Sequence, residues 1–533
     1  MTRLFRTPVI IVVALAYVLV PLAAQRTVDL DAVTIADVNA ALGKGTLTSE
    51  RLVQMFLARI DAYDRKGPTL RAVITVNPKA VEQARALDAE RKAKGPRSPL
   101  HGIPVIIKDN IDTADMPTTG GSVTLQGWVP PDDAFVVKKL RDGGAIILAK
   151  ANLSEFASGA THSSLGGQIL NPHDLTRSPA GSSGGTGVSM AAAFAMAGLG
   201  TDTGGSVRGP STNNGIAGLK TTMGLVSRDG VIPLALSFDT VGPMARSVYD
   251  VAALLSVIAG PDAADPATKA GEGRQVADYT QALKVDALKG ARIGVARDFF
   301  GQDDDVDWVM EASLDLMRKQ GATVVDVRLP KWVLDSKGEF YNAIRYPEFA
   351  AQIADYLKAT GPGYPKNIND LIERARKVNA PQPDGVSPNP GRWTLFLREA
   401  RSGPLTDYRY TSVRDHGLPM VRSVLAGIMQ SETLDAIMYP TASQRPALIS
   451  APQAVPGGSS ASGSNLANLA GFPEAIVPAG FTTDDLPVGL SLMGPAFTES
   501  RLLALAYSFE QATKVRRLPK HTPLRPGDSI AVP

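Results

Sequence analysis

The 533-residue chain contains no cysteine, and this absence excludes disulfide bonds and any thiolate nucleophile. Charge of one sign is also scarce: the formal net charge is only +3, and no long run of lysine and arginine occurs. Proteins that bind nucleic acid gather such residues on one face or along one stripe. We therefore expect no nucleic-acid partner, and any covalent catalysis must use another nucleophile.

The first two dozen residues differ from the rest of the chain. Two arginines precede an apolar stretch from 8 to 20, and Pro21, Leu22 and Ala23 lead up to Ala24. This three-part layout is typical of a secretory signal peptide, and the apolar stretch is shorter than a full membrane span. Cleavage after Ala24 would leave the large Leu22 three residues before the cut, so an uncleaved membrane anchor stays an alternative. We predict a signal peptide or anchor at 1–24 and an exported protein, periplasmic or secreted, that contacts membrane only if uncleaved.

Beyond this segment, helical and strand patterns alternate along the chain. Hydrophobic spacing predicts two helices within 34–63 and further helices at 80–94, 134–142, 188–198, 308–320 and 500–513, with strands at 72–76, 103–107, 145–149, 291–296, 323–327 and 435–439. This alternation favours an α/β layer fold with a largely buried sheet. We predict one domain over 25–533, a catalytic core at 96–250 and a variable substrate-pocket region at 335–430. No feature indicates an oligomeric state.

The segment 181–218 contains eleven glycines but only two charged residues, Asp202 and Arg208. Glycine lets the backbone turn through positive φ and come close to a ligand, whereas serine hydroxyls need an activating partner to do chemistry. The pattern predicts a buried site built largely from backbone. The group that activates these serine hydroxyls must come from elsewhere in the chain.

Two serine-based designs can be tested on the sequence. No lysine has a serine three positions before it, so the Ser-x-x-Lys arrangement is excluded. The letters GSSGG at 181–185 fit the Gly-x-Ser-x-Gly nucleophile elbow, but the preceding residues 171–179 do not read as a core strand. Only His416 and His521 follow as bases, both in polar surroundings. The elbow stays a weaker alternative.

A lysine base is the other possibility. Lys108 follows an apolar run at 103–107, which predicts a strand buried on both faces. Roughly one solvated lysine in 2,500 is neutral at pH 7, and desolvation must lower its pKa by about 3.4 units to make half of it neutral. This segment alone favours a solvated lysine at a strand end.

Taken together, Lys108, the GSSGG run at 181–185 and the TDTGGSVRGP run at 201–210 resemble the amidase signature family, in the order that this family shows. The stretch LVSRDGVIP at 225–233 is similar to bacterial peptide amidases. The resemblance implies a large, mixed, twisted central sheet covered by helices on both faces. It also implies hydrolysis of linear carboxamides through an acyl-enzyme, with a small-molecule or peptide amide as substrate and no metal or cofactor.

The resemblance also assigns residues. It makes Ser206 the nucleophile and Lys108 the base, with Ser182 relaying the proton and a cis peptide bond between Gly181 and Ser182. The oxyanion hole would be formed by the backbone N–H groups of Thr203, Gly204, Gly205 and Ser206. Among the supporting residues, Asp202 is expected to orient this loop by accepting hydrogen bonds, Arg208 to pair within the frame and Ser183 to make a structural hydrogen bond. Ser158 and Gly159 are expected to line the acyl site.

Two other functions stay open at this point. The chain could be similar in activity to the amidotransferase subunit that releases ammonia from glutamine, although the export signal argues against that cytosolic work. It could also be an exported binding protein that keeps the fold without the activity, which the intact triad argues against. The residues that choose the substrate are expected within 335–430 and near 464–468.

Overall fold

The computed structural model describes residues 26–377, 390–450 and 461–533. The predicted signal segment 1–24 and part of the predicted pocket region lie outside these ranges. Within them, no helix is both long and apolar enough to cross a membrane.

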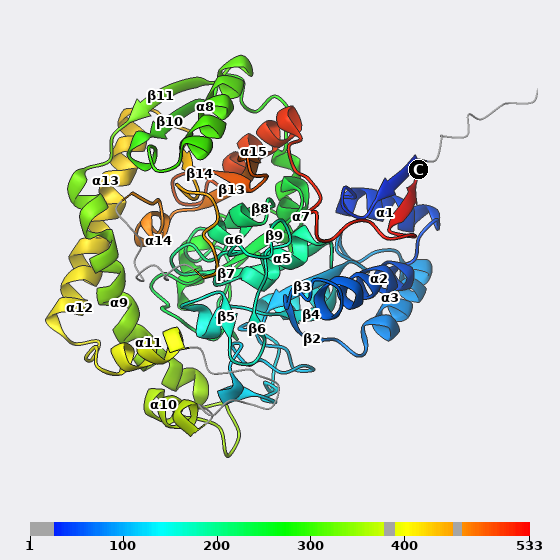
Figure 1. The fold of residues 1–533 in the computed structure, drawn as a ribbon, viewed down its shortest axis with the longest axis horizontal. Coiled ribbons are helices and arrows are strands. Elements are labelled where there is room, and N and C mark those ends of the chain that lie inside the picture. The colour runs from blue at the N-terminus through cyan, green and yellow to red at the C-terminus, as the bar shows by residue number, and fades with distance from the viewer. Residues whose placement is uncertain (1–25, 378–389, 451–460) are drawn as a thin grey trace, which may run out of the picture.

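An eleven-stranded mixed sheet forms the centre of the molecule (Figure 1), as predicted. In spatial order its strands are β11 (Thr323–Val327), β10 (Arg292–Ala296), β12 (Ala436–Pro440), β14 (Pro487–Met493), β13 (Glu474–Phe481), β8 (Ala217–Lys220), β9 (Thr240–Ala245), β7 (Ala197–Asp202), β3 (Pro104–Lys108), β4 (Ile146–Ala151) and β2 (Val73–Val76). Two small antiparallel sheets pair β1 (Arg26–Asp29) with β15 (Ser529–Val532), and β5 (His162–Ser163) with β6 (Gly167–Gln168).

Strand direction explains where the site forms. β3 runs parallel to both β4 and β7, with Ile107 opposite Leu199 in the β3–β7 register. Parallel neighbours end at the same edge of a sheet, so the last residue of β3, Lys108, lies beside the end of β7. The glycine-rich loop that follows β7 therefore begins beside the lysine.

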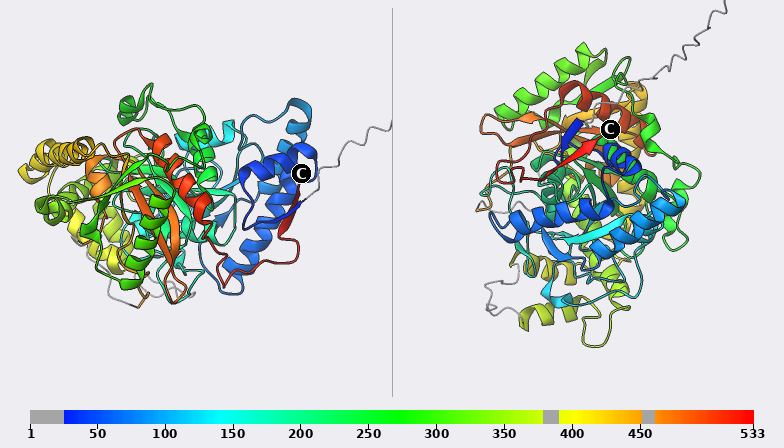
Figure 2. Two further views of the ribbon diagram at one scale, coloured as in Figure 1. Left: turned by 90° about the horizontal axis from the view of Figure 1, so that it is seen from above. Right: turned by 90° about the vertical axis from the view of Figure 1, so that its right-hand side faces the viewer.

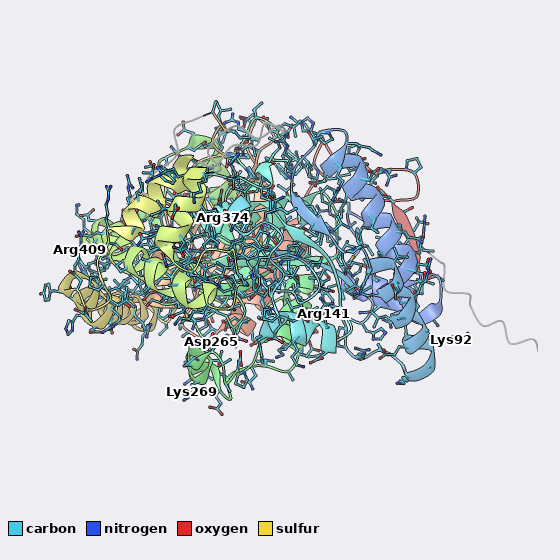
Figure 3. The ribbon with its side chains drawn as sticks, turned by 90° about the horizontal axis from the view of Figure 1, so that it is seen from below. Lys92, Arg141, Asp265, Lys269, Arg374 and Arg409 are labelled. Carbon is cyan, nitrogen blue, oxygen red and sulfur yellow. The ribbon has the colours of Figure 1, made fainter. Side chains whose placement is uncertain are left out.

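Helices cover both faces of the sheet and extend it at two ends (Figure 2). They are α1 (Ile35–Lys44), α2 (Ser49–Arg59), α3 (Ala80–Lys94), α4 (Phe135–Asp142), α5 (Gly184–Ala191), α6 (Arg208–Asn213), α7 (Val248–Ile258), α8 (Asp304–Lys319), α9 (Lys331–Leu357), α10 (Ile368–Lys377), α11 (Pro390–Ala400), α12 (Tyr408–Ser412), α13 (Leu418–Ser431), α14 (Leu466–Ala470) and α15 (Glu499–Thr513). The helices α1 to α3 and α9 to α13 lie at opposite ends, as Lys92 on α3 and Arg409 on α12 show (Figure 3).

Local signals set several of these boundaries. The side chains of Thr34 and Thr48 accept backbone N–H groups at the starts of α1 and α2, and Gly45 ends α1 with φ of 72°. These are the N-cap and C-cap roles that threonine and glycine favour. The two amphipathic helices predicted within 34–63 are confirmed.

One predicted helix is wrong in extent. The sequence predicts a helix at 188–198, but α5 begins at Gly184 and ends at Ala191, and Ala197 already belongs to β7. The stretch is alanine-rich and apolar throughout, and an apolar run of this kind cannot be divided between buried helix and buried strand by periodicity alone.

Candidate active site

Lys108 is fully buried at the end of β3 and faces oxygen atoms of hydroxyl groups. Its Nζ lies 2.6 Å from Ser182 Oγ and 2.7 Å from Thr201 Oγ1, with the carbonyl oxygen of Thr201 at 3.4 Å. The sequence prediction that this lysine is buried is confirmed, and the solvated alternative is wrong. Its contact with Ser182 joins two segments that are far apart in the sequence.

Burial controls the protonation of this lysine. Loss of hydration lowers the pKa of Lys108 to about 7, against the opposing field of Asp202 and Asp239. About half of the amine is therefore neutral near pH 7. Acidic groups are present near this lysine, but each is engaged elsewhere: Asp202 by Arg208 and Asp239 by three hydrogen-bond donors.

Ser182 and Ser183 are adjacent in the chain but have different surroundings. The peptide bond between Gly181 and Ser182 is cis, as the resemblance implied. Ser183 is fully buried, and its Oγ donates to the carbonyl oxygen of Thr201 at 3.1 Å and accepts the Thr201 N–H at 3.2 Å. The expected structural hydrogen bond of Ser183 is confirmed. Ser183 is the central serine of the GSSGG run, and its burial excludes it as the nucleophile of an elbow. His416, one of the two histidines that such a design would need as a base, is exposed just before α13.

Ser206 lies in the loop between β7 and α6, and Asp202 holds that loop in place. The Asp202 carboxylate accepts the backbone N–H of Gly205 at 2.8 Å and that of Val207 at 2.9 Å. The carbonyl oxygen of Ser206 accepts the Ser183 N–H at 3.2 Å. This bond joins the loop that holds Ser206, called the serine loop below, to the second serine loop, which holds Ser182 and Ser183. Asp202 therefore has the orienting contacts that were predicted for it.

Arg208 stabilises the same loop by binding its carboxylate, Asp202. Its guanidinium pairs with Asp202 at 3.2 Å and with Glu474 at 2.7 Å, and it also donates to Asn468. Burial by itself would raise the pKa of Asp202, but Arg208 overrides it and holds that pKa below its usual value. Asn468, which was expected to bind substrate, instead donates to Asp202 at 2.9 Å and belongs to this frame.

The four backbone amides expected to form an oxyanion hole differ in their contacts. The Gly205 N–H is already donated to Asp202, a contact that the sequence did not reveal. Gly204 packs so closely that a Cβ there would overlap Asn465 and lie 3.0 Å from the Tyr341 hydroxyl. A larger residue here would have to displace the side chains of Asn465 and Tyr341, so glycine lets α9 approach the loop closely.

Sequence reasoning missed three polar residues near Lys108, namely Thr201, Asn110 and Asp239. Thr201 Oγ1 accepts from Lys108 and, at 3.1 Å, from the Asn110 amide. The Thr203 hydroxyl donates to Asp239, and burial raises the pKa of Asp239 to about 6. Thr201 becomes a partner of the lysine only through the pairing of β3 with β7, which no local signal in the sequence predicts.

The predicted acyl-site residues Ser158 and Gly159 lie in the segment after β4. Ser158 follows a 3₁₀ turn at Glu155–Ala157, and its Oγ accepts from Arg345 of α9 at 2.7 Å. Gly159 is exposed and has φ of 96°. Their role in binding substrate stays a prediction, because the hydrogen bond of Ser158 links it to α9 rather than to Lys108, Ser182 or Ser206.

A cavity of about 300 Å³ opens beside the serine loop. It is lined by Gly205, Arg208 and Asn213 on one side and by residues from two later segments on the other, among them Ser443, Arg445 and Ser464. In the part of the chain that the structure describes, no group of three or more histidine or carboxylate side chains is arranged to hold a metal ion.

Comparison with known proteins agrees with this geometry. A family model described as Amidase matches residues 51–503. A glutamyl-tRNA(Gln) amidotransferase subunit of Roseiflexus sp. (strain RS-1) is 37% identical over 503 residues, which cover 90% of this chain and 96% of that protein. A probable amidase of Arabidopsis thaliana is 33% identical over 512 residues, covering 93% of each chain.

Two solved structures extend the comparison. The native peptide amidase of Stenotrophomonas maltophilia has a TM-score of 0.84 and 39% identity, covering 92% of this chain and 99% of that one. A glutamyl-tRNA(Gln) amidotransferase subunit of Thermotoga maritima has a TM-score of 0.71 and 28% identity, covering 93% and 99%. The chain therefore belongs to the amidase signature family, is similar in structure to a bacterial peptide amidase, and is an enzyme that cleaves amide C–N bonds.

Proposed function

We propose that the protein is a serine amidohydrolase that cleaves linear carboxamides through an acyl-enzyme. The observation that carries this proposal is the contact of 2.6 Å between Nζ of a fully buried Lys108 and Oγ of Ser182. A lysine that is half neutral near pH 7 can accept a proton, and a serine hydroxyl can pass one on. Together they supply the activating partner that the glycine-rich site lacks.

In this mechanism, Ser206 Oγ attacks the carbonyl carbon of the amide while its proton moves to Ser182 and the Ser182 proton moves to Lys108. When the tetrahedral intermediate collapses, the C–N bond breaks and the same path returns a proton to the leaving amine. Water then attacks the acyl-enzyme in the same way, releasing the carboxylic acid and restoring Ser206. No cofactor is needed for these steps.

The oxyanion of the intermediate needs backbone donors. We assign this role to the N–H groups of Thr203, Gly204 and Ser206, and give the Gly205 N–H, which Asp202 already accepts, the task of shaping the turn. Removing one donor of this kind typically costs about 2.7–4 kcal/mol of transition-state stabilisation. The close packing of Gly204 keeps the donors in place without reorganisation.

Substitution of the nucleophile tests the proposal. In Ser206→Ala, turnover of amides and covalent labelling by a fluorophosphonate should both disappear, while thermal unfolding should stay within a few degrees of the wild type. Ser431→Ala, which changes an exposed serine at the end of α13, serves as the matched control and should keep both. Wild-type turnover or labelling in Ser206→Ala would exclude Ser206 as the nucleophile. A wild type that is never labelled would instead favour a non-catalytic binding protein.

For the substrate, we propose C-terminal amides of peptides. The similarity to the Stenotrophomonas maltophilia peptide amidase, higher in both identity and TM-score than that to the Thermotoga maritima protein, supports this choice. The competing candidate is glutamine hydrolysis, which the relatives named as glutamyl-tRNA(Gln) amidotransferase subunits favour. Ammonia release from a panel of peptide amides and from free glutamine decides between them. Faster release from glutamine would overturn the proposal.

We also propose that the enzyme is exported, because the first 24 residues have the layout of a signal peptide. The full chain, expressed in a Gram-negative host, should appear in the periplasmic fraction with Gln25 as its first residue. Recovery in the cytoplasm with residues 1–24 attached would contradict export.

A further inference from the structure

The helix α9 presents a row of polar side chains to the loops around the candidate site. Lys337, Tyr341 and Arg345 are spaced four residues apart and therefore share one face of the helix. Lys337 donates to the carbonyl oxygens of Ser462 and Ser464, and all three α9 side chains are buried. This face packs against Gly204 and donates to Ser462 and Ser464, two residues that line the cavity beside the serine loop.

Arg345 is the member of this row whose hydrogen bonding is incomplete. One terminal nitrogen, Nη2, lies 2.7 Å from Ser158 Oγ and 2.8 Å from a carboxylate oxygen of Glu399. The other two nitrogens, Nε and Nη1, are buried and have no hydrogen-bond partner among the described residues. The side chain as a whole is fully buried.

Such donors are expensive to leave unpaired. A buried polar group without a partner is disfavoured, and a charged group is disfavoured most. Native structures satisfy nearly all of these groups, so each exception needs an explanation. A ligand that brings a hydrogen-bond acceptor to Arg345 is one explanation that can be tested.

The charges nearby favour a neutral acceptor. Glu399 already lies opposite Arg345, and the Tyr346 ring stacks on the guanidinium with its centroid 4.7 Å from Cζ. Glu399 is shared with Arg392, whose two terminal nitrogens lie 3.1 and 3.0 Å from its oxygens, and a second buried carboxylate, Glu155, also acts on Arg392, so the two cations have two anions nearby. The positive charge of Arg345 is thus partly offset, whereas its hydrogen-bonding capacity is not. A carbonyl oxygen meets that requirement without adding charge.

Two contacts connect Arg345 to the reacting centre. One helical turn before it, Tyr341 lies against Gly204 of the serine loop. On the other side, its partner Ser158 follows Ala157, which lines a small internal cavity together with Thr203 and Thr201. Arg345 therefore stands between the serine loop and the predicted acyl-site residues.

We propose that Arg345 determines specificity by donating a hydrogen bond to a second carbonyl oxygen on the acyl side of the substrate, one peptide unit away from the amide that is cleaved. The preferred substrates are then N-acylated amino acid amides rather than simple aliphatic amides. This inference rests on the proposed amidohydrolase function and extends it to the residue that reads the substrate.

A substrate pair tests the proposal without relying on a mutation alone. N-acetyl-leucinamide and 4-methylpentanamide share the scissile amide and the isobutyl chain, but only the first has the second carbonyl. In the wild type, kcat/KM should favour N-acetyl-leucinamide. In Arg345→Met, kcat/KM for N-acetyl-leucinamide should fall about 10- to 100-fold, mainly through KM, as expected for loss of a hydrogen bond to a charged group. The value for 4-methylpentanamide should change less than about threefold.

Controls separate specificity from folding. Arg345→Lys keeps a cation beside Glu399 and should show the same selective loss even if Arg345→Met unfolds. Arg398→Met, which removes an exposed arginine of α11, should leave both substrates unchanged. Labelling of Ser206 by a fluorophosphonate should persist in every variant, so its loss in the wild type would indicate failure of the proposed function instead.

Two results would overturn the proposal. An equal loss on both substrates in the two Arg345 variants would give Arg345 a structural role only. A wild-type preference for succinamate, lost in both variants, would make the site a carboxylate pocket.

Discussion

Two buried lysines on neighbouring strands of the same sheet differ in their side-chain partners: one contacts a carboxylate and the other contacts hydroxyl groups. Lys108 ends β3 and Lys150 lies one residue from the end of β4, paired with Ile107 in the register, and both are fully buried. Lys150 lies 3.2 Å from the Asp109 carboxylate and 2.6 Å from the Thr118 hydroxyl, whereas the side-chain partners of Lys108 are the hydroxyls of Ser182 and Thr201.

The difference separates a base from a structural cation. A carboxylate that is itself buried favours the ammonium form and fixes it in place, whereas a hydroxyl can accept a hydrogen bond from an ammonium or donate one to an amine. Burial is common to both lysines, so burial alone does not make a base. Both lysines also contact a hydroxyl, so what distinguishes them is the Asp109 carboxylate, which contacts Lys150 and has no counterpart among the contacts described for Lys108.

Replacing the proposed base should have the largest effect. In Lys108→Met, kcat/KM for amides should fall roughly 10²- to 10⁴-fold, the contribution typical of a positioned base. Thermal stability should not fall, because the methionine fills the same space and removes an amine that resists burial. Steady-state kinetics and a melting curve measure the two effects. Retention of even a tenth of the activity would place the base elsewhere.

Replacing the neighbouring lysine should give the opposite result. Lys150→Met leaves the Asp109 carboxylate buried without its cation, and breaking a buried pair in this way typically costs about 3–5 kcal/mol. Denaturant unfolding measures that cost. Activity per labelled Ser206 should stay within about tenfold of the wild type, because Lys150 touches neither serine loop directly. If folded Lys150→Met lost as much activity as Lys108→Met, the distinction between a base and a structural cation would be wrong.

The smallest effect is expected from the second hydroxyl. Thr201→Val removes an acceptor that stabilises the charged form of Lys108, so the pKa of the lysine should fall further. The acid limb of the pH profile should move to lower pH, with a loss of about tenfold or less in the plateau as the amine loses one orienting contact. Movement of the limb to higher pH would contradict the assignment of that limb to Lys108.

Much of this site can be predicted from the sequence, because many of its features depend on residues that are close together in the chain. The apolar run before Lys108 indicates a buried strand end, and the glycine and serine pattern indicates tight loops. The pairing of Asp202 with Arg208 can also be predicted, because the two residues are close in the sequence and were expected to stabilise the loop. These contacts depend mainly on residues a few positions apart.

What the sequence leaves out depends on strand order and distant segments. Thr201 reaches Lys108 because β7 lies beside β3, and Glu474 reaches Arg208 because α6 packs against β13. Tyr341 reaches Gly204 of the serine loop, and Arg345 reaches Ser158, from a helix more than a hundred residues downstream. One sequence contains no record of these pairings, so residues 335–430 could be assigned to the pocket only as a region.

The central claim is that a buried, readily neutralised Lys108 is the base, and the pH dependence of wild-type kcat/KM tests it most directly. The neutral amine is the active form, and the pKa of Lys108 is about 7. The rate should therefore rise tenfold per pH unit below about pH 7 and reach a plateau above it, since kcat/KM reports groups of the free enzyme. A flat profile from pH 5 to 9 would contradict the account.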